Sequence, residues 1–195
     1  MIETQLMSSS VFTFLLITAA EMGDKSQIVC MTLAAKHKAK PVFWGSVLAF
    51  LLLNAIAVAL GASLSTMLPM NLLTAVAAVM FTIFGLQALL SKNHDEDASL
   101  PTKLSRSIFI TAFSIIFIAE MGDKTQLAVA SLSTTENPLM VWISASVALI
   151  VTTAIGVFAG SRWLAKLNIN TVHKLSGCLF LLFALFATIR LFNYG

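Results

Sequence analysis

A short charged motif occurs twice in this chain, each time inside a long apolar stretch. The two copies are Glu21-Met22-Gly23-Asp24-Lys25-Ser26-Gln27 and Glu120-Met121-Gly122-Asp123-Lys124-Thr125-Gln126. Each stretch is long and apolar enough to cross a membrane, where an isolated charge at mid-bilayer costs about 2.5 to 3.5 kcal/mol on insertion-based scales. Charged groups at that depth indicate a functional site, and their duplication suggests two half-sites that meet.

The side chains of the motif suit a hard cation. Four carboxylates, with hydroxyl and amide groups beside them, form an all-oxygen environment, which calcium, magnesium and manganese prefer, whereas zinc and copper favour His and Cys. The carboxylates are those of Glu21, Asp24, Glu120 and Asp123. Together with two lysines they leave a net charge of −2, which one divalent cation or two protons would balance. We therefore expect metal and protons to compete for the same carboxylates.

The glycine of each motif has two interpretations. If the first copy stays helical, Glu21 and Asp24 lie on neighbouring ridges, with Lys25 and Gln27 close to the same face. Gly23 would then let another helix approach closely. Alternatively, Gly23 marks a break whose freed backbone groups help to bind a solute, and the same choice applies to Gly122. The sequence leaves both open.

Two simpler roles for the polar residues also have to be weighed. Glu21 with Lys25, and Glu120 with Lys124, could form structural ion pairs, but buried pairs are weak stabilisers and the duplication argues for more. Asn54 lies in the middle of an apolar run and aligns with a threonine of the second half. It could supply an oxygen to the ion pathway or simply join two helices.

The composition is that of an integral membrane protein. The 195 residues are 58% hydrophobic and 11% charged, whereas an ordinary soluble domain carries about 25% charged residues. No clustered basic face is present, so nucleic acid is not an expected partner. Cys30 and Cys178 lie in apolar runs and are interpreted as packing residues. No cofactor is expected, and the partners are the lipid bilayer and a divalent cation substrate. A homo-oligomer is compatible with the sequence.

Six apolar runs predict an all-α membrane protein with six transmembrane helices, because each run is near or above the ~20 residues that a spanning helix needs. The runs cover residues 8–35, 42–66, 70–90, 106–133, 139–161 and 171–192.

The repeat extends well beyond the motif and divides the chain into halves. At a constant offset of 99 residues, matching side chains recur without a gap. Examples are Val42 and Val141, Ala55-Ile56 and Ala154-Ile155, Gly61 and Gly160, and Phe81 and Phe180. We expect two three-helix repeats, 1–90 and 106–195, joined by a cytoplasmic linker, 91–105, within one membrane domain. Since each half has an odd number of spans, the repeats would be inverted, as in many transporters with sites at the bilayer midplane.

Basic residues in the loops predict the orientation. The loops after the first, third and fifth spans carry Lys36, Lys38, Lys40, Lys92, Lys103, Arg106, Arg162, Lys166 and Lys174, whereas the opposite side has Arg190. The basic side should be cytoplasmic. The chain is then expected in the cell (inner) membrane, with both termini on the non-cytoplasmic side.

The paired motifs resemble those of the type-2 calcium/cation antiporters, small membrane proteins defined by two copies of Glu-x-Gly-Asp-(Lys/Arg)-(Ser/Thr). The resemblance covers essentially the whole chain, and both copies fit without departure. It implies a proton-coupled exchanger of manganese or calcium, most similar to the bacterial manganese exporters. By this resemblance the four carboxylates bind the cation and six motif residues support them: Lys25, Ser26, Gln27, Lys124, Thr125 and Gln126.

Other functions fit the sequence less well. An intramembrane aspartyl protease using Asp24 and Asp123 would resemble a Gly-x-Gly-Asp pattern, but Glu21 and Glu120 replace the first glycine and a lysine follows each aspartate. The chain is therefore not expected to be an enzyme. A calcium/proton exchanger of the same family, an exporter of small organic solutes such as basic amino acids, and a passive channel remain as alternatives. The expected function is a divalent cation/proton antiporter that exports manganese from the cytoplasm.

Overall fold

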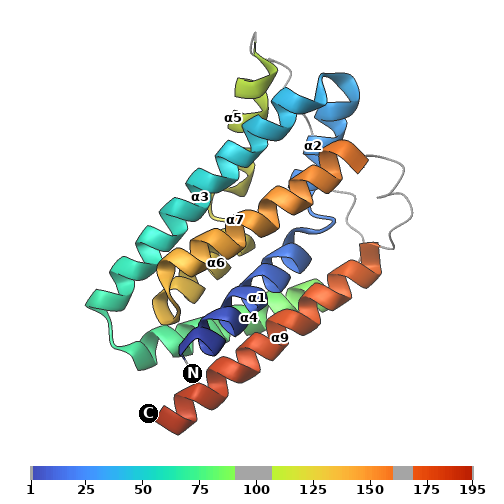
Figure 1. Ribbon diagram of the computed structural model, residues 1–195. Helices are drawn as coiled ribbons and strands as arrows, with labels where there is room; N and C mark the ends of the chain where they lie inside the picture. The colour runs from blue at the N-terminus through green and yellow to red at the C-terminus, as the bar shows by residue number, and fades with distance from the viewer. Residues whose placement is uncertain (1, 91–106, 160–168, 195) are drawn as a thin grey trace.

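The computed structural model describes residues 2–90, 107–159 and 169–194, and this part of the chain is helical with short connections. The expected linker 91–105 and several of the loop cations lie outside the described residues. Figure 1 shows the helices, which are α1 (Ile2–Glu21), α2 (Lys25–Lys36), α3 (Ala39–Met67), α4 (Met70–Leu90), α5 (Ile108–Glu120), α6 (Lys124–Thr135), α7 (Pro138–Ala154), the π-helical turn η1 (Ile155–Ala159) and α9 (Ile169–Tyr194).

The first and fourth predicted spans are each broken into two helices. Gly23 separates α1 from α2 with φ 81°, and Gly122 separates α5 from α6 with φ 82°. Glycine adopts this left-handed conformation without the steric cost that a Cβ imposes. Directly after each glycine, Asp24 and Asp123 take an extended conformation and begin α2 and α6. The sequence left two interpretations of these glycines open, and in the structure each glycine breaks its helix.

The breaks shorten the apolar helices. Within residues 2–90, 107–159 and 169–194, three helices are long and apolar enough to span a membrane, namely Ala39–Met67, Met70–Leu90 and Pro138–Phe158. Shorter apolar helices in the described part of the chain are Ser9–Glu21, Ile108–Glu120 and Lys174–Ile189. The all-α membrane class is confirmed, while six complete spans remain a prediction.

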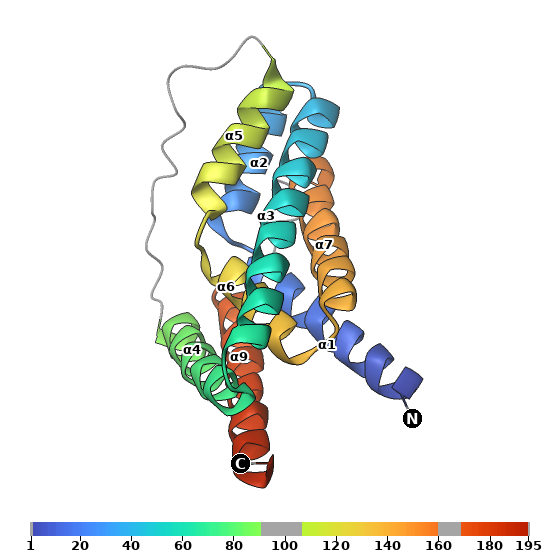
Figure 2. The same cartoon turned by 90° about the vertical axis from the view of Figure 1, so that its left-hand side faces the viewer.

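Helix α3 lies at the centre of the packing. It contacts α5, α6 and α7, while α1 packs against α7, and α4 runs alongside α9 (Figures 1 and 2). Phenylalanine rings join α1, α4 and α9, because the ring of Phe183 lies 3.4 Å from that of Phe12 and 5.3 Å from that of Phe81 between centroids. This packing holds the two broken helices against the long ones.

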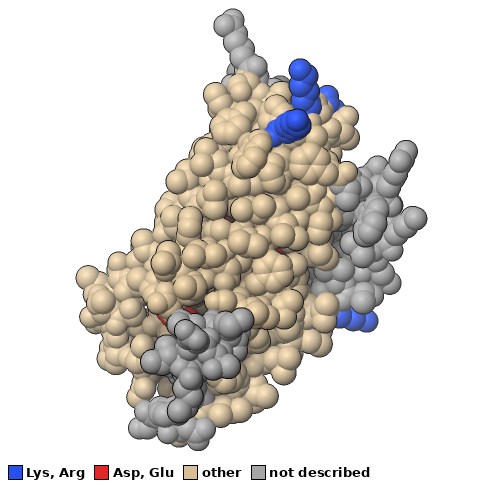
Figure 3. All heavy atoms as spheres, viewed as in Figure 1, with Lys and Arg blue, Asp and Glu red and all other residues tan. Residues whose placement is uncertain are grey.

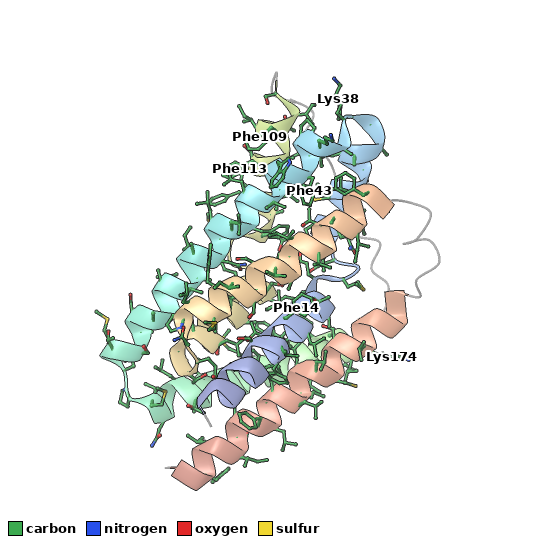
Figure 4. All side chains as sticks on the ribbon, in the orientation of Figure 1. Phe14, Lys38, Phe43, Phe109, Phe113 and Lys174 are labelled. Carbon is green, nitrogen blue, oxygen red and sulfur yellow. The ribbon has the colours of Figure 1, made fainter. Side chains whose placement is uncertain are left out.

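Two lysines lie near the starts of two parallel helices, away from the chain termini. In Figure 4, Lys38 lies beside the start of α3 and Lys174 near the start of α9, and these two helices run in the same direction. The start of α1 and the end of α9 both lie toward the other end of the molecule (Figures 1 and 2). Between them, the face seen in Figure 3 is almost free of charged side chains in the described part of the chain. That surface suits contact with lipid.

Candidate cation site at the two helix breaks

The two breaks have the same local structure. In the first, the amide N–H of Gly23 donates to Gln27 Oε1 at 2.7 Å, and that of Gly122 donates to Gln126 Oε1 at 2.5 Å in the second. The amides of Asp24 and Asp123 donate to the carbonyls three residues before them, at 3.1 and 3.2 Å. Each motif therefore folds as a unit that presents its aspartate at the N-terminus of a short helix.

Glu21 lies where the two motifs meet. Its side chain is 1% exposed, and its Oε2 accepts a hydrogen bond of 3.0 Å from Thr125 Oγ1 of the other motif. Its second oxygen accepts from the hydroxyl of Ser26. Since both partners are hydroxyls, each can rotate and offer a lone pair to a cation instead of a proton to the carboxylate.

An ion pair also connects the motifs. Lys124 Nζ lies 2.8 Å from Asp24 Oδ2, and the two side chains are 30% and 12% exposed. The sequence suggested pairs within one motif, Glu21 with Lys25 and Glu120 with Lys124. In the structure, the pair joins one motif to the other, because the break turns Asp24 toward the neighbouring short helix rather than along its own.

The remaining carboxylates belong to the same cluster. Glu120 is 4% exposed, and the charges of Glu21, Asp123 and Asp24 all act on it. Asp123 Oδ2 is buried and has no hydrogen-bond partner among the described residues. No three His, Cys, Asp or Glu side chains in the described part of the chain form a ready-made metal-binding group. The structure thus gathers the four predicted carboxylates around Lys124, and their role as ligands remains a prediction.

Asn54 joins helices in this structure. Its Nδ2 donates to Ser146 Oγ at 3.2 Å, from α3 to α7. This contact matches the second of the two roles that the sequence left open, while an oxygen of Asn54 in the ion pathway remains a prediction.

The structure adds residues that the motif did not reveal. A narrow crevice, too tight to admit a water molecule, lies beside Glu21; the motif residues Ser26 and Gln27 line it together with Cys30, Phe50, Thr152 and Thr153. Cys30 Sγ donates to Ser46 Oγ at 3.2 Å next to it. The sequence indicated part of this lining, because Ser26 and Gln27 belong to the motif and Thr153 aligns with Asn54.

The two motif glutamines each contact the opposite half. Gln27 Nε2 donates to the carbonyl of Thr152 at 3.0 Å, and Gln126 Nε2 donates to the carbonyl of Leu53 at 3.3 Å. Both amide groups are therefore occupied by protein partners.

This combination of broken helices and clustered intramembrane carboxylates defines a class of ion transporter. The chain matches the family described as "Divalent cation/proton antiporter GDT1" over residues 9–96 and 108–193, and it belongs to that family. The resemblance stated from the motifs is thereby confirmed. The family consists of transporters, so the expectation that the chain is not an enzyme is confirmed as well.

Similar proteins occur in plants and bacteria. A "GDT1-like protein 3" of Arabidopsis thaliana is 27% identical over 88% of this chain and 67% of its own length. A "Putative manganese exporter" of Vibrio cholerae is 28% identical over 92% of this chain and 90% of its own length. A GDT1-like protein of Synechocystis is 27% identical over 87% of this chain and 91% of its own length. No solved structure matches.

Proposed function

We propose that the protein exports manganese from the cytoplasm in exchange for protons, with one cation site formed jointly by the two motifs. The observation that carries this proposal is the contact between motifs: Thr125 donates to Glu21, and Lys124 pairs with Asp24. The name of the Vibrio relative supports manganese as the cargo.

The charges of the cluster explain why metal and protons would exchange. Lys124 supplies one positive charge against Asp24. An entering divalent cation displaces this ammonium group and takes oxygens from the carboxylates and from the rotated hydroxyls of Ser26 and Thr125. On the return, protons replace the cation, because the fully charged empty cluster is costly in a medium of low dielectric.

The repeat supplies a route for alternating access. In Figure 2, α1 begins at the end where the termini lie, whereas α5 begins at the opposite end. This opposed direction supports two inverted repeats, 1–90 and 106–195, that move around the shared site. The start of α1 and the end of α9 lie away from Lys38 and Lys174 (Figures 1 and 4), which supports termini on the non-cytoplasmic side.

The test is transport by purified protein in liposomes, with manganese, calcium and internal pH followed together. An imposed pH gradient, acidic on the destination side, should drive manganese against its own gradient. Calcium moving in place of manganese would identify the calcium/proton exchanger. Metal that moves only downhill, without a pH change, would indicate a channel, and export of basic amino acids without metal would indicate an organic-solute carrier.

A further inference from the structure

We propose that Gln27 and Gln126 are positioning residues that clamp the two halves of the molecule onto each other. Release of Gln27 would open the site along α2, and release of Gln126 would open it along α6. This inference rests on the proposed function, because it assigns to these residues the closing step of alternating access.

The hydrogen bonds of the two glutamines are related by the repeat. Each side chain accepts from the glycine amide of its own break and donates to a backbone carbonyl of the opposite half. The accepting carbonyls belong to Leu53 of α3 and Thr152 of α7, and residues 53 and 152 are separated by the same 99 residues as the motifs. The two contacts are therefore related by the repeat. Such a pair is expected if each half closes the site in turn during alternating access.

Both ends of each amide make a hydrogen bond, so each side chain links its own break to the opposite half. A primary amide offers one carbonyl oxygen and one NH₂ group. For Gln27, the oxygen holds the Gly23 amide at 2.7 Å and the nitrogen holds the Thr152 carbonyl at 3.0 Å. The break and the opposite helix therefore cannot separate unless one of these two hydrogen bonds is broken.

The surroundings of the two clamps differ. Gln27 is 3% exposed, and a Cβ added to Gly156 would lie 2.9 Å from its Cγ, so a glycine in η1 makes room for it. The π-helical turn η1 follows Thr152 closely, and such turns interrupt the regular hydrogen bonding of a helix. Gln126 is only half-buried, and its bond to Leu53 is the longer one. The first clamp lines the narrow crevice beside Glu21.

Two repeat-related positions can report on each clamp separately. Cys30 on α2 and position 129 on α6 are both buried and are 99 residues apart. With Cys178 replaced by Ala, Cys30 serves as the first reporter. A second protein carries Val129→Cys together with Cys30→Ser and Cys178→Ala. The measured quantity is the rate of alkylation by N-ethylmaleimide in proteoliposomes without metal, relative to total labelling after denaturation.

Gln27→Leu should raise the alkylation rate at Cys30 by about fivefold or more, since it removes the hydrogen bonds that oppose local opening, and should leave the rate at position 129 within about twofold. Gln126→Leu should show the converse pattern. If the Leu variants do not insert, Gln27→Met and Gln126→Met remove the same hydrogen bonds with an unbranched side chain and no added charge, and the same one-sided pattern is expected.

Equal increases at both reporters would show general destabilisation and overturn the proposal, and so would no increase at either. Since alkylation is measured without metal, the clamps can be tested even if manganese/proton exchange fails.

Discussion

Replacing Lys124 by Gln should make manganese bind more tightly. If the ammonium group of Lys124 holds Asp24 until the metal arrives, metal binding must first break the 2.8 Å ion pair. Losing an exposed ion pair changes the free energy of folding by about 0.2–1 kcal/mol, and removing one partner of a buried ion pair changes it by about 3–5 kcal/mol. Lys124 is 30% exposed, so we take a value near the lower range, about 1.4 kcal/mol. That corresponds to about a tenfold lower Kd.

The assay is equilibrium manganese binding to purified protein, for example by titration calorimetry, at one pH and ionic strength. Lys38→Gln is the control, because it makes the same change of charge on an exposed side chain at the start of α3, outside both motifs. It should lower the Kd by less than about threefold, since it acts through longer-range and screened electrostatics.

Two results would refute this reasoning. If Lys124→Gln leaves the Kd unchanged or raises it, the lysine supports the site rather than competing for it. If both variants tighten binding equally, net charge alone explains the effect, and the contact with Asp24 has no special role.

Further predictions concern the same site and its orientation. Asp24→Asn and Asp123→Asn should each abolish manganese transport at matched protein level in membranes, because each keeps the shape and removes one charge; normal uptake by either would remove that carboxylate from the site. Thr125→Val should weaken manganese binding by about three- to tenfold, as a hydroxyl oxygen beside Glu21 is lost; unchanged binding would leave this hydroxyl a merely structural role. A cysteine at Lys38 should be protected from an impermeant thiol reagent in intact cells, whereas one at Leu139 should be labelled; the opposite pattern would reverse the direction of transport.

Much of the fold could be predicted from the sequence because hydrophobicity is a strong local signal. The apolar runs gave α3, α4, α7 and α9 with approximately correct ends. The chemistry of the site was also readable, since charges inside apolar runs are rare. The sequence could not decide whether the helix breaks at Gly23, because a glycine permits both a close helix contact and a left-handed turn.

Contacts across the site could not be predicted, because they depend on how the helices pack. A helical motif favours pairing at a spacing of four residues, so Lys124 was matched with Glu120. The break redirects it to Asp24 of the other motif. Similarly, nothing in the sequence marks the backbone carbonyl of Thr152 as the partner of Gln27. Such partners become visible only when the repeats lie against each other.

The most direct test of the central claim is to count the manganese sites in the purified protein and the protons released on binding. The account predicts a single site per chain that releases protons, and the loss of that site in Asp24→Asn and in Asp123→Asn alike. Two independent sites in the wild-type protein, with one surviving in each variant, would contradict it, because each motif would then bind metal alone.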